Sequence, residues 1–113
     1  MQLITATVTF TNGTAVVLGG LTAFAGIPRG AVAKLYVEPA AANTHVCYLG
    51  DKSLATGTSV VDHVIRVLAV PVAGAALDSY RVESQQNLDS INLSDFSMDG
   101  TTSEQARISV CVG

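Results

Sequence analysis

A regular alternation of apolar and threonine residues at the start of the chain is the feature that most constrains its fold. In an extended chain, one face would carry the apolar side chains Ile4, Ala6, Val8 and Phe10, and the opposite face the threonines at positions 5, 7 and 9. A two-residue period with β-branched residues is typical of a strand with one buried face. Asn12-Gly13 follows, and because both residues tolerate positive φ, the pair indicates a tight turn. We therefore expect a hairpin in which residues 14–18 return as the second strand.

Short β-favouring segments recur through the rest of the chain. They cover residues 31–38, 45–49, 60–70, 80–82, 91–98 and 107–112, with turn-forming residues between them. The second of these is expected to end at Gly50-Asp51. The run 60–70 is rich in β-branched residues, lacks helix caps and stops before Pro71, so we interpret it as a buried strand rather than a helix.

About eight strands at this spacing, with no convincing helix, predict an all-β fold: an antiparallel β-sandwich or a jelly-roll-like barrel. The chain carries no internal repeat, low-complexity tail or linker. We expect residues 1–113 to form a single β-domain.

The composition favours a surface that meets other proteins. Charged residues make up 13% of the 113 residues, against about 25% in an average globular protein. The net charge is −3 and the six basic residues are scattered, so we expect no nucleic-acid partner. No apolar run is long enough to span a bilayer and no basic segment precedes residues 15–27, which argues against a membrane protein and a signal peptide. With 49% hydrophobic residues and few charges, some apolar surface is expected to contact a partner.

The residues that most often carry chemistry form no recognisable motif. His45 and His63 lie outside any catalytic or metal-binding pattern, so we predict no enzyme activity and no cofactor. A dyad of Cys47 with a histidine is a weak alternative. Cys47 and Cys111 both lie in apolar runs, which favours buried thiols, with a disulfide between them or a reactive thiol as alternatives.

One segment has a metal-like spacing. Residues 95–100 match the first half of a calcium loop, with oxygen ligands at positions one, three and five and glycine at six. The closing glutamate at position twelve is replaced by Ala106. We therefore interpret the segment as a strand ending in an Asp-Gly turn and predict no metal, with a calcium site as the alternative.

A longer pattern spans residues 46–112. Its parts are Gly50-Asp51-Lys52-Ser53, Thr56-Gly57, Val70-Pro71-Val72, Asp78-Ser79-Tyr80, the segment 87–100 (NLDSINLSDFSMDG) and residues 106–110 (ARISV). This order resembles small structural proteins of tailed bacteriophages, whose chains carry an early glycine-aspartate turn and end on an Asn-Leu-Ser strand, a glycine turn and a last valine-rich strand. The closing glycine-aspartate turn of that pattern is replaced here by Ser103-Glu104-Gln105.

The resemblance implies a virion protein made in the host cytoplasm. It points to a capsid decoration or cement protein, commonly a homotrimer, seated on the outer surface of the head and bound to the major capsid protein. A head–tail connector, a tail or fibre protein, and a monomeric binding module remain alternatives. We expect the contact to involve the first strand and the Gly/Pro loop 19–30, through Ile4, Ala6, Val8, Phe10, Phe24, Ile27, Pro28 and Arg29.

Overall fold

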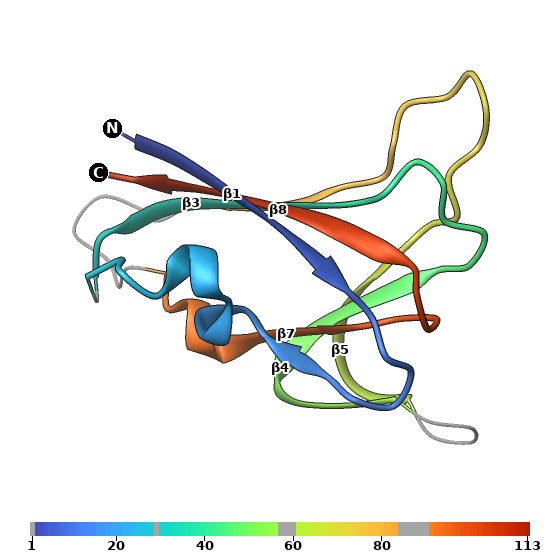
Figure 1. Cartoon of the computed structure of the whole chain (residues 1–113), viewed down its shortest axis with the longest axis horizontal. Coiled ribbons are helices and arrows are strands. Elements are labelled where there is room, and N and C mark those ends of the chain that lie inside the picture. Colours follow the sequence, from blue (N-terminus) through green and yellow to red (C-terminus); the bar gives the residue numbers. More distant parts are fainter. Residues whose placement is uncertain (1, 29, 57–60, 84–90) are drawn as a thin grey trace.

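The computed structural model describes residues 2–28, 30–56, 61–83 and 91–113 and consists of antiparallel strands joined by turns (Figure 1). The strands are β1 (Gln2–Thr9), β2 (Val16–Val17), β3 (Val32–Pro39), β4 (Cys47–Thr56), β5 (Val61–Leu68), β6 (Tyr80–Glu83), β7 (Phe96–Asp99) and β8 (Gln105–Val112). Three short 3-10 helices complete the described elements: η1 (Leu18–Gly20), η2 (Thr22–Phe24) and η3 (Leu93–Asp95). The prediction of an all-β fold with about eight strands is confirmed.

The strands form two layers. The first sheet has the order β1-β8-β3-β6, and the second sheet has the order β2-β7-β4-β5. Every pairing is antiparallel. Figure 1 shows the first sheet above the second, with both chain ends at the same side of the molecule. The fold is therefore the expected antiparallel β-sandwich.

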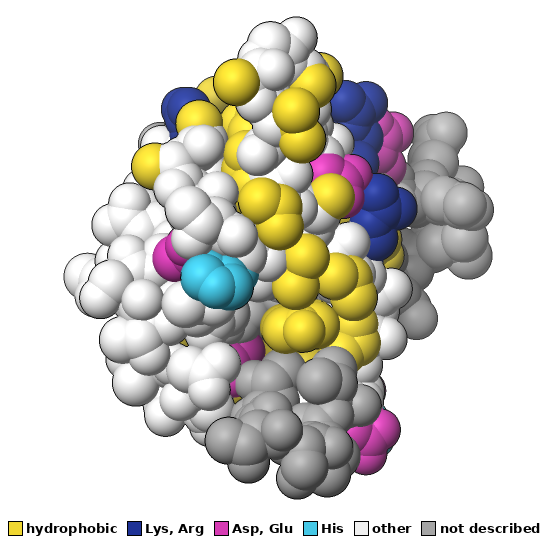
Figure 2. Space-filling view, turned by 90° about the vertical axis from the view of Figure 1, so that its right-hand side faces the viewer, with side chains coloured by type: hydrophobic (Ala, Val, Ile, Leu, Met, Phe, Trp, Pro, Cys, Tyr) yellow, Lys and Arg dark blue, Asp and Glu magenta, His cyan; other side chains and the backbone are white. Residues whose placement is uncertain are grey.

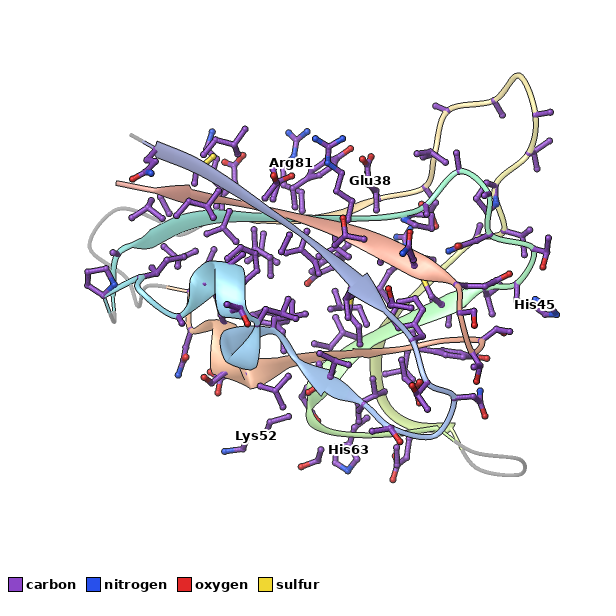
Figure 3. All side chains as sticks on the ribbon, viewed as in Figure 1. Glu38, His45, Lys52, His63 and Arg81 are labelled. Carbon is purple, nitrogen blue, oxygen red and sulfur yellow. The ribbon has the colours of Figure 1, made fainter. Side chains whose placement is uncertain are left out.

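The core lies between the two sheets and follows from the alternation in the strands. Its largest fully buried side chains include Phe10, Leu35 and Ile108 from the first sheet or its ends, and Leu49 and Met98 from the second. The apolar face of residues 4–10 points inward, as the two-residue period predicts. The opposite face of the first sheet is polar, and in Figure 3 Glu38 and Arg81 point away from the core.

The turn at Asn12-Gly13 forms, but the expected hairpin does not. The amide of Thr14 donates to the carbonyl of Thr11 at 2.9 Å, and Gly13 has a φ of 85°. The strand that follows is β2, which pairs with β7 in the second sheet instead of returning along β1. The expectation of a β1 hairpin was wrong because this turn carries the chain from one sheet to the other.

Two contacts explain this crossing. The amide of Gly13 donates to Oδ2 of Asp99 at 3.0 Å, and the amide of Asn12 donates to Oγ1 of Thr102 at 3.1 Å. Both acceptors lie at the end of β7 or in the turn that leads to β8. The carboxylate of Asp99 is fully buried, and this burial raises its pKa above the ordinary value for an aspartate.

Three further strand predictions need correction. The strand expected at residues 91–98 begins only at Phe96, because Leu93–Asp95 form the 3-10 helix η3, which the side chain of Asn92 caps. The strand expected at residues 45–49 continues through Gly50-Asp51 to Thr56, with a register shift between Gly50 and Ala55. The run interpreted as a buried strand forms β5, which is an edge strand of the second sheet. Its side chains at Ile65 and Val67 are exposed, because successive side chains of a strand point to opposite faces and the neighbouring Leu68 points into the core.

Close packing at Gly100 yields a prediction for stability. A Cβ atom added there would lie 2.6 Å from the ring of Phe10, in the fully packed core. We expect Gly100→Ala to lower the free energy of unfolding by roughly 1–3 kcal/mol, measured by urea denaturation. Gly20→Ala is the matched control, since a Cβ there meets nothing within 4 Å. Equal losses for the two variants would contradict this account of the packing.

Candidate functional site

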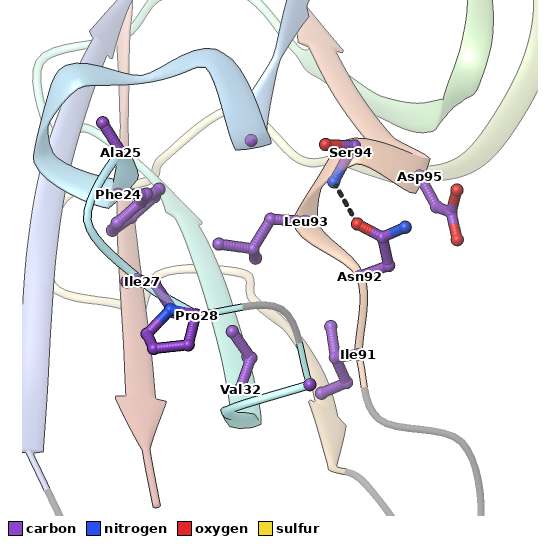
Figure 4. Close-up of a pocket in the computed structure, with 12 residues that line it drawn as sticks. Phe24, Ala25, Ile27, Pro28, Val32, Ile91, Asn92, Leu93, Ser94 and Asp95 are labelled. Carbon is purple, nitrogen blue, oxygen red and sulfur yellow. Dashed lines mark hydrogen bonds between the residues drawn. The ribbon is translucent and has the colours of Figure 1, made fainter.

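A cleft opens between the loop after η2 and the segment that leads into β7 (Figure 4). Its volume is about 640 Å³. The apolar walls consist of Phe24, Ile27, Pro28, Val32, Ile91 and Leu93. Most of these side chains also belong to the edge of the core, so the cleft is a shallow continuation of the core to the surface.

The polar groups of this cleft serve the local turn. The side-chain oxygen of Asn92 accepts the amide of Ser94 at 3.1 Å and caps η3 (Figure 4). The described lining residues include the hydroxyl of Ser94 and the carboxylate of Asp95, but no histidine, cysteine, lysine or arginine. The Ser94 hydroxyl therefore has no histidine or lysine in this lining to activate it as a nucleophile.

The structure separates the residues expected at an interface into two groups. Phe24, Ile27 and Pro28 gather at the cleft. Ile4, Ala6, Val8 and Phe10 lie on the inner face of the first sheet, where Val8 and Phe10 are buried and the other two are half-buried. The inward side chains of β1 therefore pack against their own core. Arg29 lies outside the described residues.

A second candidate surface is an exposed row of large aliphatic side chains, which we call the apolar strip. It consists of Ile65, Val67, Val70 and Val72, with exposed fractions of 45%, 45%, 38% and 68%. Figure 2 shows a band of hydrophobic side chains running down this side of the molecule. A contiguous band differs from single scattered hydrophobic residues and is typical of a contact surface.

An ion pair and a hydrogen bond anchor the chain where β5 ends, between the two pairs of residues in the apolar strip. Nη2 of Arg66 in β5 lies 2.6 Å from Oδ1 of Asp78, and the amide of Ala69 donates to the other carboxylate oxygen at 2.9 Å. The hydrogen bond from Ala69 and the neighbouring guanidinium lower the pKa of Asp78. Asp78 therefore fixes the start of the segment that carries Val70 relative to β5.

The two histidines lie far apart, at the right-hand end and below the second sheet in Figure 3. His63 has a φ of 61°, and its Nδ1 lies 3.0 Å from Oδ2 of Asp51. The bond to Asp51, reinforced by the nearby Asp62, raises the pKa of His63. Among the described residues, no group of three or more histidine, cysteine or acidic side chains is arranged to hold a metal ion.

His45 belongs to a hydrogen-bonded clamp around Glu104. The carboxylate of Glu104 accepts the amide and the hydroxyl of Thr44, both at 2.8 Å, and the amide of His45 at 3.1 Å. These bonds lower the pKa of Glu104 to about 2. The clamp ties the connection between β3 and β4 to the turn before β8, so its donors and acceptors serve the fold.

The cysteines and the calcium-like segment also have structural explanations. Cys47 and Cys111 are free thiols, the first buried and the second half-buried. Burial raises the pKa of Cys47 to about 12, which keeps it protonated and argues against a thiolate nucleophile. Residues 95–100 form the end of η3, then β7, and Asp99 accepts the amides of Gly13 and Gly100. The strand agrees with the interpretation of the spacing, but the turn lies after Gly100, where the amide of Glu104 donates to the carbonyl of Thr101.

Comparison with known proteins identifies no relative. No protein-family model matches the chain, and neither the curated proteins nor the solved structures include a significant match. In the described part of the chain, no helix is long and apolar enough to cross a membrane.

The clamp yields a prediction for acid stability. The pKa of Glu104 falls from an ordinary 4.5 to about 2 on folding, so its contribution to stability is present above about pH 4.5 and is lost as the pH falls towards 2. We expect Glu104→Gln to lower the melting temperature at pH 7. The difference from the unmodified chain should shrink between these two pH values, as measured by thermal unfolding followed by circular dichroism.

Glu83→Gln is the control for this series. Glu83 forms an exposed ion pair with Lys34 at 3.9 Å, and pairs of this kind contribute little to stability. We expect the melting temperature of this variant to follow that of the unmodified chain at every pH. A pH-independent effect of Glu104→Gln would show that the clamp does not depend on the charge of the carboxylate.

Proposed function

We propose that this chain is a non-catalytic virion subunit of a tailed bacteriophage, and specifically a capsid decoration or cement protein on the outer surface of the head. The single observation that carries the binding part of the proposal is the apolar strip Ile65, Val67, Val70 and Val72. The virion part rests on the resemblance in residues 46–112.

The energetics of the apolar strip suit a binding surface. Fully burying an exposed valine or isoleucine side chain stabilises a complex by roughly 1.5–3 kcal/mol, and about half of that is available where the side chain is already half-buried. Four such side chains therefore offer several kcal/mol, enough to matter against the entropy lost on association. Because the chain carries few charged residues, few charged groups lose their hydration when the surface binds a partner.

The position of the apolar strip supports a protein partner. It lies on β5, an edge of the second sheet, and on the segment that Asp78 anchors. A preformed apolar surface binds without first ordering its backbone, which lowers the entropic cost. Such a surface fits the proposed partner, the major capsid protein, better than a charged ligand.

Binding to empty particles tests the proposal. Expanded heads of the parent phage that lack this chain would be incubated with the purified protein and separated by sedimentation. A decoration protein should saturate at many copies per head, whereas a connector should saturate at few copies, and a tail protein or an unrelated binding module should not sediment with the heads. Saturation at few copies, or no sedimentation with the heads, would overturn the decoration proposal.

Substitutions test the role of the apolar strip. We expect Val67→Lys to weaken binding to the heads by at least about tenfold, because a charge at a half-buried contact loses its hydration. Val17→Lys is the matched control, since Val17 is a 37% exposed valine on β2, at the other edge of the same sheet. Equal occupancy by both variants would show that the apolar strip does not form the contact.

A further inference from the structure

The four sheet edges of the described fold differ in how well they are protected from pairing with another chain. β2 spans two residues and β6 spans four, with Arg81 and Glu83 among them. β5 carries Asp62 and Arg66 and is interrupted by the left-handed backbone of His63. Short length, charge and irregular backbone are the devices by which proteins protect open edges.

β1 has none of these devices. Its eight residues, QLITATVT, include no charge, proline or glycine. It pairs with β8 in an uninterrupted one-to-one register from Gln2 to Thr9. No strand among the described residues lies on its other side. A long, regular and uncharged edge of this kind is a template for another strand.

The backbone groups that face this open edge can be identified from the next residue, Phe10. Its amide donates to the carbonyl of Glu104 at 2.9 Å and its carbonyl accepts the amide of Ser103, so both groups face the β8 side. Backbone groups alternate in direction along an antiparallel strand. The amides and carbonyls of the alternate residues therefore face the open edge, and these residues are Leu3, Thr5, Thr7 and Thr9.

We infer that β1 pairs antiparallel with β1 of a second copy of this chain, across a twofold axis at Ala6. In this register Leu3 lies opposite Thr9 of the second copy, and Thr5 lies opposite Thr7. The open-edge amides and carbonyls of these residues all gain partners, and shifting the axis to Thr5 or Thr7 would leave some without one. The inference goes beyond the proposed function, because it needs no viral shell.

In this register the β1 side chains of the two copies form compatible pairs on both faces of the joined sheet. On the inner face Ala6 meets Ala6, a small residue where the two backbones approach most closely, and Ile4 meets Val8. Ile4 and Ala6 are half-buried at the open end of the core, so a second copy would join the two cores. On the outer face Thr5 meets Thr7, a favourable cross-strand pair, and Leu3 meets Thr9.

Charge also favours a second copy as the partner. In this register a charge at position 6 would lie opposite itself, and like charges at positions 5 and 7 would lie opposite each other, which destabilises the pair. β1 carries no charge, so this cost does not arise. The resulting twofold pair differs from the threefold assembly that the phage resemblance implies, because a strand pairs antiparallel with its own copy only about a twofold axis.

Sedimentation equilibrium of the purified chain, from micromolar to millimolar concentration, tests this inference. We expect a mass of two chains that dissociates on dilution. A monomer throughout, or a mass of three chains, would overturn it. A negative result in this experiment would not contradict the proposed function. The proposed function depends on the apolar strip, which lies away from β1, and is tested separately by binding to phage heads.

Charge substitutions test the register. Thr5→Lys combined with Thr7→Lys places like charges opposite each other twice, and we expect the dimer dissociation constant to rise by at least about tenfold. Thr5→Lys combined with Thr7→Glu places opposite charges together at the same two sites, and this matched variant should remain dimeric. Circular dichroism should show that both variants fold. If both fold and dimerise equally well, or if neither dimerises, the proposed register is wrong.

Discussion

The crossing of the chain from the first sheet to the second is the constraint on which the rest of the structure depends. The backbone of Phe10 pairs with the turn before β8, and the amide of Gly13 donates to the buried carboxylate of Asp99. These bonds bring the ends of β1, β7 and β8 to one place. The ring of Phe10 packs against Gly100 at the same point, which leaves no room for a side chain there. The two sheets can therefore face each other and enclose one apolar core.

Titratable groups in this fold act mainly as structural ties. Asp78 holds the segment after β5 to Arg66 and Ala69, and Glu104 holds the β3–β4 connection to the turn before β8. Cys47 is a buried thiol whose pKa is raised, and the histidines lie apart. The unusual features are instead on the surface, where the apolar strip is exposed and β1 offers an unprotected edge. The proposed function depends on the first of these surface features, and the inferred dimer depends on the second.

The sequence pattern predicted the strands better than their partners. Alternation in residues 4–10 identified a half-buried strand because a period of two is a local property of the backbone. The tight turn at Asn12-Gly13 was also local, since it depends on the conformations open to two residues. The partner of the following strand was not local, because the pairing of β2 with β7 and the bond from Gly13 to Asp99 join residues far apart in the chain. The apolar strip was not predicted for a related reason. A segment rich in apolar residues has the same sequence pattern whether its side chains are covered by the rest of the fold or by a partner.

The sequence alone determined an all-β chain with few charges, an inward apolar face on its first strand and no motif for catalysis. Those properties depend on residue type and spacing, which the chain carries before it folds. Tertiary structure decided which strands became edges and which strand faces became covered, and the covering of faces is why Val8 and Phe10 are buried while Ile65 and Val67 are exposed. It also decided that Phe24, Ile27 and Pro28 share a cleft while Ile4 and Ala6 lie at the open edge of the core. Strand order is set by contacts between residues far apart in the chain, and local periodicity contains no record of them.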